Sequence, residues 1–144
     1  MSVTITPDKF IRKAISDKIN NIIVSGKTIK TFDSRVTGSV NYTEYILTSV
    51  QSKDVLKDTK CDYSWDTSTL IEIYTKYPLA GNTGSRLLLN DIESAVWALL
   101  QPKLVIENFT NVTQNVSFEF SGLDTTTETD IIYRSFLRVN IILQ

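Results

Sequence analysis

The first part of the chain has apolar residues at helical spacing, which predicts a helix over residues 6–24. Thr6 can cap its first turn, Pro7 suits the first helical position, and Asp8 complements the positive end of the helix dipole. Ser25 and Gly26 follow, and a glycine readily takes the left-handed conformation that ends a helix. The apolar positions are Phe10, Ile11, Ala14, Ile15, Ile19, Ile22 and Ile23.

The middle of the chain changes to patterns that are typical of β-strands. Strands are predicted over residues 27–32 and 42–50, with a charged, solvated loop over residues 52–60. In residues 61–77 the odd positions are mostly apolar or aromatic and the positions between them mostly polar, which indicates a half-buried strand. The polar residues 66–68 leave a break within that strand open.

Proline and glycine residues in the segment 78–84 make the clearest break in the chain. A second helix is predicted from Thr83 or Ser85 to Leu100, and Pro102 closes it. Its apolar residues form one stripe, which consists of Leu88, Ile92, Ala95 and Leu99 and is widened by Leu89, Val96 and Leu100.

Two further strands complete the predicted domain. In the first, Val112, Val116, Phe118 and Phe120 share one face by alternation, and residues 121–129 then form a Thr-rich, acidic hairpin tip. The last strand covers residues 130–143 and is apolar on one side. Because each strand has a single apolar face, we predict one α+β domain over residues 1–144. Its sheet is mainly antiparallel, with about four to five strands and two helices packed on one face.

The composition of the chain limits the functions that we expect of it. The 144 residues carry a net charge of −1, which gives no basic footprint for sequence-specific nucleic-acid binding. Cys61 is the only cysteine, which fits synthesis in a reducing compartment. Neither a signal peptide nor an apolar stretch of membrane-spanning length is predicted.

The chemistry of common active sites is absent from the sequence. The chain has no histidine, so it lacks the most frequent general base and metal ligand. Carboxylates that could gather around a hard cation lie in turn-like segments, where such side chains usually face water. These candidates are Asp62, Asp66, Asp124, Glu128 and Asp130. We therefore predict a protein without enzymatic activity, metal or cofactor.

Trp97 is the first candidate contact residue for a partner. At about 100° per residue it lies nearly opposite Leu88, away from the apolar stripe of its helix. Large amphipathic rings of this kind are enriched at the centres of protein interfaces. Packing under the N-terminal arm or against the first helix is an equally open reading.

The hairpin tip and the last strand supply the other interface candidates. Asp124 and Glu128 lie in the tip, and long polar loops on a rigid sheet often bind partners. Arg134 and Arg138 lie beside Phe136 on the polar side of the last strand. These two arginines either pair with acidic groups of a neighbour or act as edge charges that prevent aggregation.

The order of elements resembles a known family. The residues that carry the resemblance are Phe10, Ile11, Ala14 and Ile15, the strand 70–76, the helix 86–100 and the closing strand 133–141. In this order they look like the tail-terminator and tail-to-head joining proteins of tailed bacteriophages. Connector or ring proteins of short-tailed phages fit the pattern too.

The resemblance implies a structural virion protein that is made in the host cytoplasm. It further implies that the chain forms a six-fold or twelve-fold ring with copies of itself at the neck or tail, next to other virion proteins. The alternative is a cytoplasmic adaptor or inhibitor that binds one host protein through the same loops. Neither reading involves a membrane.

Overall fold

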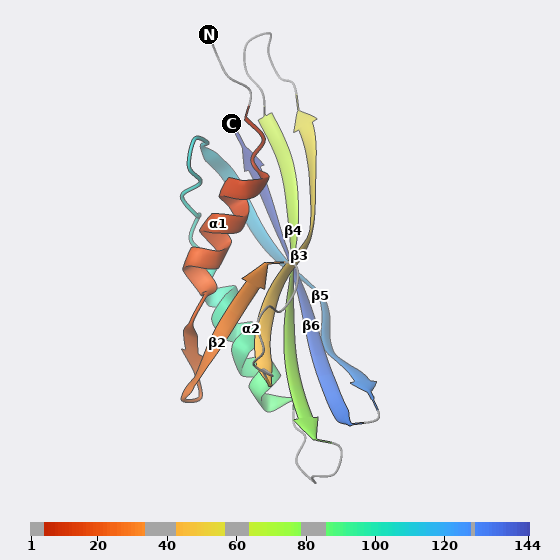
Figure 1. Ribbon diagram of the computed structural model, residues 1–144. Coiled ribbons are helices and arrows are strands. Elements are labelled where there is room, and N and C mark those ends of the chain that lie inside the picture. The colour runs from red at the N-terminus through yellow and green to blue at the C-terminus, as the bar shows by residue number, and fades with distance from the viewer. Residues whose placement is uncertain (1–4, 34–42, 57–63, 79–85, 128) are drawn as a thin grey trace.

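A computed structural model describes residues 5–33, 43–56, 64–78, 86–127 and 129–144 of the protein (Figure 1). The α+β class predicted from the sequence is confirmed. In chain order the elements are α1 (Asp8–Ile19), β1 (Ile22–Val24), β2 (Lys27–Asp33), β3 (Glu44–Leu56), β4 (Ser64–Pro78), α2 (Leu87–Leu99), β5 (Asn111–Thr126) and β6 (Asp130–Leu143).

The strands form one mixed, curled sheet in the order β1-β2-β3-β4-β6-β5. All neighbours are antiparallel except β2 and β3, which run parallel. The expectation of about four to five mainly antiparallel strands is therefore wrong in its strand number, and it missed the parallel pair. The extra strand comes from the segment that was predicted to end the first helix.

The first helix ends earlier than its apolar spacing predicts. It stops at Ile19, and Asn21 then takes a left-handed backbone conformation with φ of 60°. Ile22–Val24 forms β1, which pairs with β2 across a tight turn at Ser25 and Gly26. Both turn residues have positive φ, 51° and 78°, as a two-residue hairpin of the right twist requires. The glycine that was expected to end the helix instead turns a hairpin.

The charged segment after residue 50 is not wholly a loop. Gln51 to Leu56 continue β3 and pair with β4, while residues 57–60 lie outside the described part. The break considered at residues 66–68 does not occur, because β4 is continuous there. Thr67 faces the core, and its buried hydroxyl donates a hydrogen bond of 2.8 Å to the carbonyl of Ile141. A buried hydroxyl group that has such a hydrogen-bond partner allows a polar residue to occupy a central strand.

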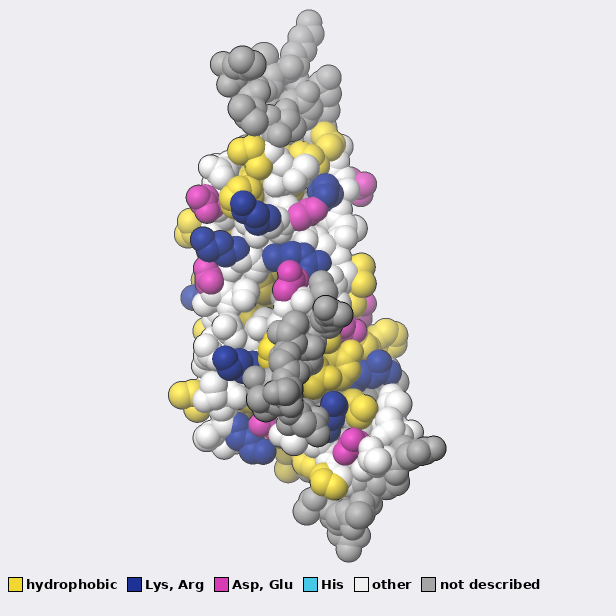
Figure 2. Space-filling model, in the orientation of Figure 1, with side chains coloured by type: hydrophobic (Ala, Val, Ile, Leu, Met, Phe, Trp, Pro, Cys, Tyr) yellow, Lys and Arg dark blue, Asp and Glu magenta, His cyan; other side chains and the backbone are white. Residues whose placement is uncertain are grey.

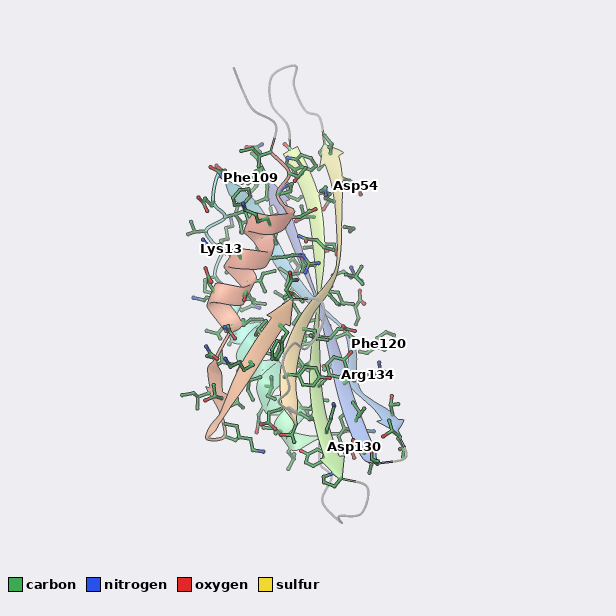
Figure 3. The ribbon with its side chains drawn as sticks, in the orientation of Figure 1. Lys13, Asp54, Phe109, Phe120, Asp130 and Arg134 are labelled. Carbon is green, nitrogen blue, oxygen red and sulfur yellow. The ribbon has the colours of Figure 1, made fainter. Side chains whose placement is uncertain are left out.

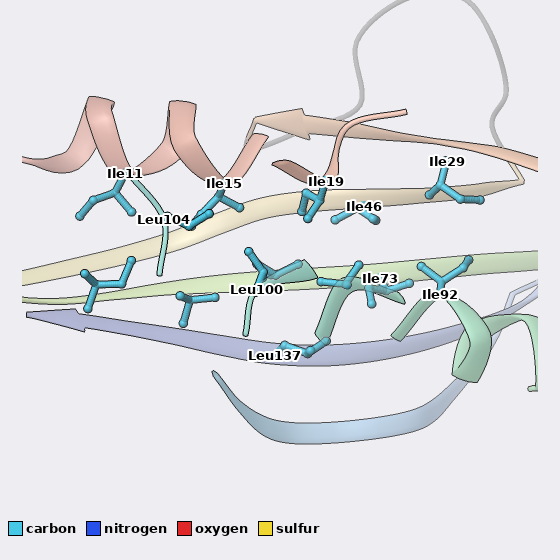
Figure 4. Close-up of a cluster of buried hydrophobic side chains, with 14 of the residues drawn as sticks. Ile11, Ile15, Ile19, Ile29, Ile46, Ile73, Ile92, Leu100, Leu104 and Leu137 are labelled. Atoms are coloured by element: carbon cyan, nitrogen blue, oxygen red, sulfur yellow. The ribbon is translucent and has the colours of Figure 1, made fainter. Parts of the chain in front are cut away.

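Both helices lie on the same side of the long strands and share one hydrophobic core (Figures 1 and 4). Helix α2 starts at Leu87, later than predicted, and buries Leu89, Ile92 and Val96. Every second side chain is buried from Trp65 to Thr75 in β4 and from Ser135 to Leu143 in β6. The fully buried apolar side chains include Ile11, Ile15, Ile19, Ile71, Ile73, Leu137 and Ile141.

Candidate assembly interface

Strand β5 is the longest strand and lies at one edge of the sheet. It pairs along one side with β6, and in the described part of the chain no strand pairs with its other side. Long edges of this kind are usually protected by lysine or proline, because their free backbone groups can pair with another chain. Residues 111–126 contain neither lysine, arginine nor proline. The strand thus keeps an edge that a partner can extend.

The first residues of β5 are nevertheless covered by the segment that follows α2. Lys103 donates a hydrogen bond of 2.7 Å from Nζ to the carbonyl of Val112. The side-chain amide of Gln114 donates to the carbonyls of Leu100 and Pro102 at 2.6 and 3.0 Å. These contacts leave residues 115–126 as the uncovered part, which we call the open β5 edge.

A bulge at Glu119 decides where the aromatic residues of β5 point. Phe118 is opposite Leu137 and Phe120 is opposite Phe136. Two steps along β5 therefore correspond to a single step along β6. Leu137 faces the core, whereas Phe136 faces away from it. The prediction that Phe118 and Phe120 share one face is therefore wrong, because an extra residue in one strand reverses the alternation.

On the helix side of the sheet, Trp97 of α2 stacks on Phe118. Their ring centroids are 6.4 Å apart with an angle of 27° between the planes. Trp97 is 41% exposed and Phe118 is 49% exposed, so the pair is only half covered by its own chain. Trp97 thus packs beside the edge strand, whereas the first residues of the N-terminal arm lie outside the described part of the chain.

On the other side of the sheet, Phe120 meets Phe136 edge to face at a centroid distance of 5.8 Å. Phe120 is 58% exposed, and Figure 3 shows it close to Arg134 at this margin of the molecule. The guanidinium carbon of Arg134 lies 5.7 Å from the Phe136 ring centroid. Its Nη2 donates a hydrogen bond of 3.2 Å to Thr125 Oγ1. Aromatic rings therefore flank the open β5 edge on both faces.

Arg138 has a partner within its own chain. Its guanidinium forms an ion pair with Glu119 at the bulge, and its Nη1 donates to Ser68 Oγ at 2.7 Å. The hydrogen bond from Arg138 holds the pKa of Glu119 below its ordinary value. Neither arginine is an edge residue, since β6 lies between β4 and β5. That part of the prediction is wrong.

The acidic candidates are less informative. The predicted tip is mostly strand, and the turn itself is short. Thr127 N donates to the carbonyl of Asp130 at 2.8 Å, and Asp130 N donates to Thr127 Oγ1 at 2.9 Å. Asp124 lies opposite Tyr133 in the register, but its side chain is outside the described part, as is all of Glu128. Asp130, labelled in Figure 3, begins β6.

A second aromatic row on the outer face is structural. Tyr45 and Tyr74 stack with centroids 4.9 Å apart, and Phe32 meets Tyr45 edge to face at 6.4 Å. Burial raises the pKa of both tyrosines above the ordinary value. Tyr45 is only 8% exposed, so this row contributes to the stability of the sheet and presents little surface.

The best-formed hollows among the described residues are open grooves. A shallow groove of about 290 Å³ lies between α1 and the segment after α2, next to Phe10 and Val105. In the same residues no cluster of three or more potential metal ligands occurs. Neither described helix combines the length and hydropathy of a membrane span. On the face shown in Figure 2, positive and negative side chains are interspersed.

Comparison with known proteins does not indicate a family for this chain. No family model matches the chain, and the curated proteins contain no match. Sequence reasoning identified Trp97 and Phe136 but missed Phe118, Phe120 and Glu119, because the alternation of β5 placed both phenylalanines in the core. The missing signal is the composition of the strand, which has no lysine or proline to protect an edge.

Proposed function

We propose that this protein is a structural subunit that assembles with copies of itself into a ring in the virion of a tailed bacteriophage. The ring is of the tail-terminator or head–tail connector type and lies at the neck or tail. The self-assembly in this proposal is supported by the open β5 edge, which has exposed aromatic rings on both faces.

The energetics of this edge favour a protein partner. Strand addition gives a partner backbone hydrogen bonds, while pockets for alternate side chains give specificity. Truncation of an interface hot spot costs ~2 kcal/mol or more, and aromatic residues are enriched among hot spots. Trp97, Phe118 and Phe120 are each 41–58% exposed in the single chain. They can therefore still gain free energy from burial by a neighbour.

The virion assignment rests on the order of elements. An amphipathic first helix, a central strand, a second helix and a long closing strand follow one another as in the tail-terminator and tail-to-head joining proteins that the sequence resembles. A ring needs two different surfaces on each subunit, and it closes only if the rotation between subunits allows closure. The sequence has no histidine, and a protein that acts through its surfaces needs none.

The decisive experiment measures the oligomeric state of the purified chain. Native mass spectrometry and sedimentation velocity should give one defined oligomer, or a monomer that joins a ring when purified tails or portal complexes are added. Electron microscopy should show closed rings. A chain that stays monomeric and ignores those particles would contradict the proposal. A 1:1 complex with a host protein in a pulldown would favour the adaptor alternative instead.

A further inference from the structure

We infer that the open β5 edge pairs with the distal edge of β3 in the next copy of this chain. The distal β3 edge consists of residues 50–56. This inference rests on the proposed ring assembly and names the two surfaces that build it. The contact is heterologous, since one patch of a subunit meets a different patch of its neighbour.

The distal β3 edge has the same unpaired character as the open β5 edge. Strand β2 pairs with β3 only from Tyr45 to Thr48. Next to that point the guanidinium of Arg12 donates to the carbonyls of Thr48 and Ser49, at 3.1 and 2.6 Å. Farther along β3, α1 contacts only side chains, namely Gln51 through Arg12 and Lys53 through Asp8, and no described strand lies along this side of β3. The exposed apolar side chains there are Val50, Val55 and Leu56, at 60%, 51% and 38%.

Strand direction suits this pairing. The three contacts β3·β4, β4·β6 and β6·β5 are all antiparallel, so β5 runs opposite to β3 within one subunit. A neighbour in the same orientation therefore presents its β3 antiparallel to β5. Antiparallel edges can therefore pair without any change in the direction of the subunit, on either side of the bulge at Glu119.

The two parts of the sequence that contain these edges carry opposite net charges. Residues 1–60, which include α1 and β1–β3, contain ten Lys and Arg against six Asp and Glu. Residues 61–144 contain five against ten, so the two halves carry net charges of +4 and −5. Association of the β3 end with the β5 end brings opposite charges together, whereas pairing of two β5 edges brings two acidic halves together. The asymmetry favours the head-to-tail contact.

The two edges are offset along the strands. Asp54 of β3 lies level with Ile142 of β6, through Asp66 of β4, while Phe120 lies level with Phe136. Bringing the edges together shifts each copy by six residues along β6, or about 20 Å. The shift is necessary because β2 already occupies the proximal part of the β3 edge. Such a stagger closes into a ring only if the strands are inclined to the ring axis, and otherwise produces a fibre.

A mixing experiment tests the pairing. Phe120→Asp blocks the open β5 edge and leaves β3 intact, while Val55→Asp blocks the distal β3 edge and leaves β5 intact. Each variant alone should self-associate at least about 30-fold more weakly in sedimentation velocity. The equimolar mixture should form 1:1 heterodimers that cannot grow. Val105→Asp, at a valine that is 92% exposed but lies on neither edge, should assemble like the wild type.

The outcomes separate this inference from the proposed function. If the wild type assembles and Val55→Asp does so equally well, the β3 pairing is wrong and the ring proposal stands. Fibres of the wild type that both variants abolish would support the pairing and contradict the ring. If the wild type assembles under no condition, both the ring proposal and the pairing of β5 with β3 are wrong.

Cross-linking keeps the test valid if an aspartate variant fails to fold, which circular dichroism would reveal. In a Cys61→Ser background, a short thiol cross-linker should join the Val55→Cys chain to the Phe120→Cys chain. Neither chain should be cross-linked when it is alone. Cross-linking of Phe120→Cys to itself would instead indicate two β5 edges in contact and overturn the inference.

Discussion

Strands β5 and β6 are neighbours of similar length that behave in opposite ways. Strand β6 spans 14 residues, and from Ser135 to Leu143 every second side chain is buried. Strand β5 spans 16 residues, yet none of its described side chains is fully buried. Its register against β6 shifts three times, whereas the register of β6 against β4 does not shift.

This contrast indicates that β6 stabilises the fold of the subunit, whereas β5 keeps exposed surface for a partner. Strand β6 has partners on both edges and α2 on its inner face, so its apolar residues are buried within the subunit. Strand β5 has a partner on one edge, and its bulge turns Phe120 away from the core. Residues of β6 should therefore control folding, and residues of β5 should control association.

The largest expected effect is on folding and comes from Leu137→Ala in β6. Leu137 is fully buried, and truncation of such a leucine costs about 2–5 kcal/mol because a cavity remains. Its cross-strand neighbour Phe118 provides the matched control. Phe118→Ala should cost about 1 kcal/mol, since half of the ring is already in water. Urea unfolding measures both, and equal losses would show that β5 is as much part of the core as β6.

Phe120→Ala should have the next largest effect, on association rather than on folding. Loss of an aromatic ring that a neighbour covers should weaken assembly by about 2 kcal/mol, or roughly 30-fold. The free energy of unfolding should change by less than about 1 kcal/mol, because the ring is 58% exposed. Sedimentation equilibrium measures the first quantity and urea unfolding the second. Leu87→Ala, at an exposed leucine of α2, should leave association unchanged.

Trp97→Ala should weaken association by a smaller amount, about 1 kcal/mol, because Trp97 supports Phe118 from the helix and lies farther from the backbone edge. Trp97→Phe should recover most of the loss. Fluorescence reports the same contact, since Trp97 is 41% exposed while Trp65 is buried. In a Trp65→Phe background, the emission should shift to shorter wavelength on assembly. An unchanged spectrum in assembled protein would place Trp97 outside the interface.

Much of the architecture follows from local pattern. Helical spacing identified both helices, and alternation identified β4 and β6, because these elements bury one face against a core inside the same subunit. Thr67 and Thr69 are buried in β4 by the same alternation, although the polar residues 66–68 had left a break in this strand open. Tertiary context, which supplies a carbonyl for the hydroxyl of Thr67, outweighs composition there.

The remaining features depend on contacts that spacing does not encode. Ile22 and Ile23 continue the helical spacing of α1, but Asn21 and the turn at Gly26 favour a hairpin. The bulge at Glu119 is one extra residue, and nothing in the alternation of its neighbours signals it. The candidate interface was therefore predicted only in part, at Trp97 and Phe136, while its centre at Phe118 and Phe120 was assigned to the core.

The smallest expected effect concerns the ion pair at the bulge, where Glu119 meets Arg138. The hydrogen bond from Arg138 lowers the pKa of Glu119 below 4.5, so the folded state favours the charged form. The stabilisation is therefore present above the ordinary pKa and is lost as the pH falls through the lower pKa of the folded state. The Glu119 side chain is 34% exposed, so the effect on unfolding should stay below about 0.5 kcal/mol.

Urea unfolding of the wild type and of Glu119→Gln at pH 7 and pH 3 measures this contribution. The wild type should be slightly more stable than the variant at pH 7, and the difference should become smaller at pH 3 as protonation of Glu119 removes its charge. A difference that is unchanged at pH 3 would mean that Glu119 acts through the backbone geometry of the bulge rather than through its charge. The contrast between β5 and β6 would then rest on bulge conformation, and Glu119→Gln should also alter the association of Phe120 with its neighbour.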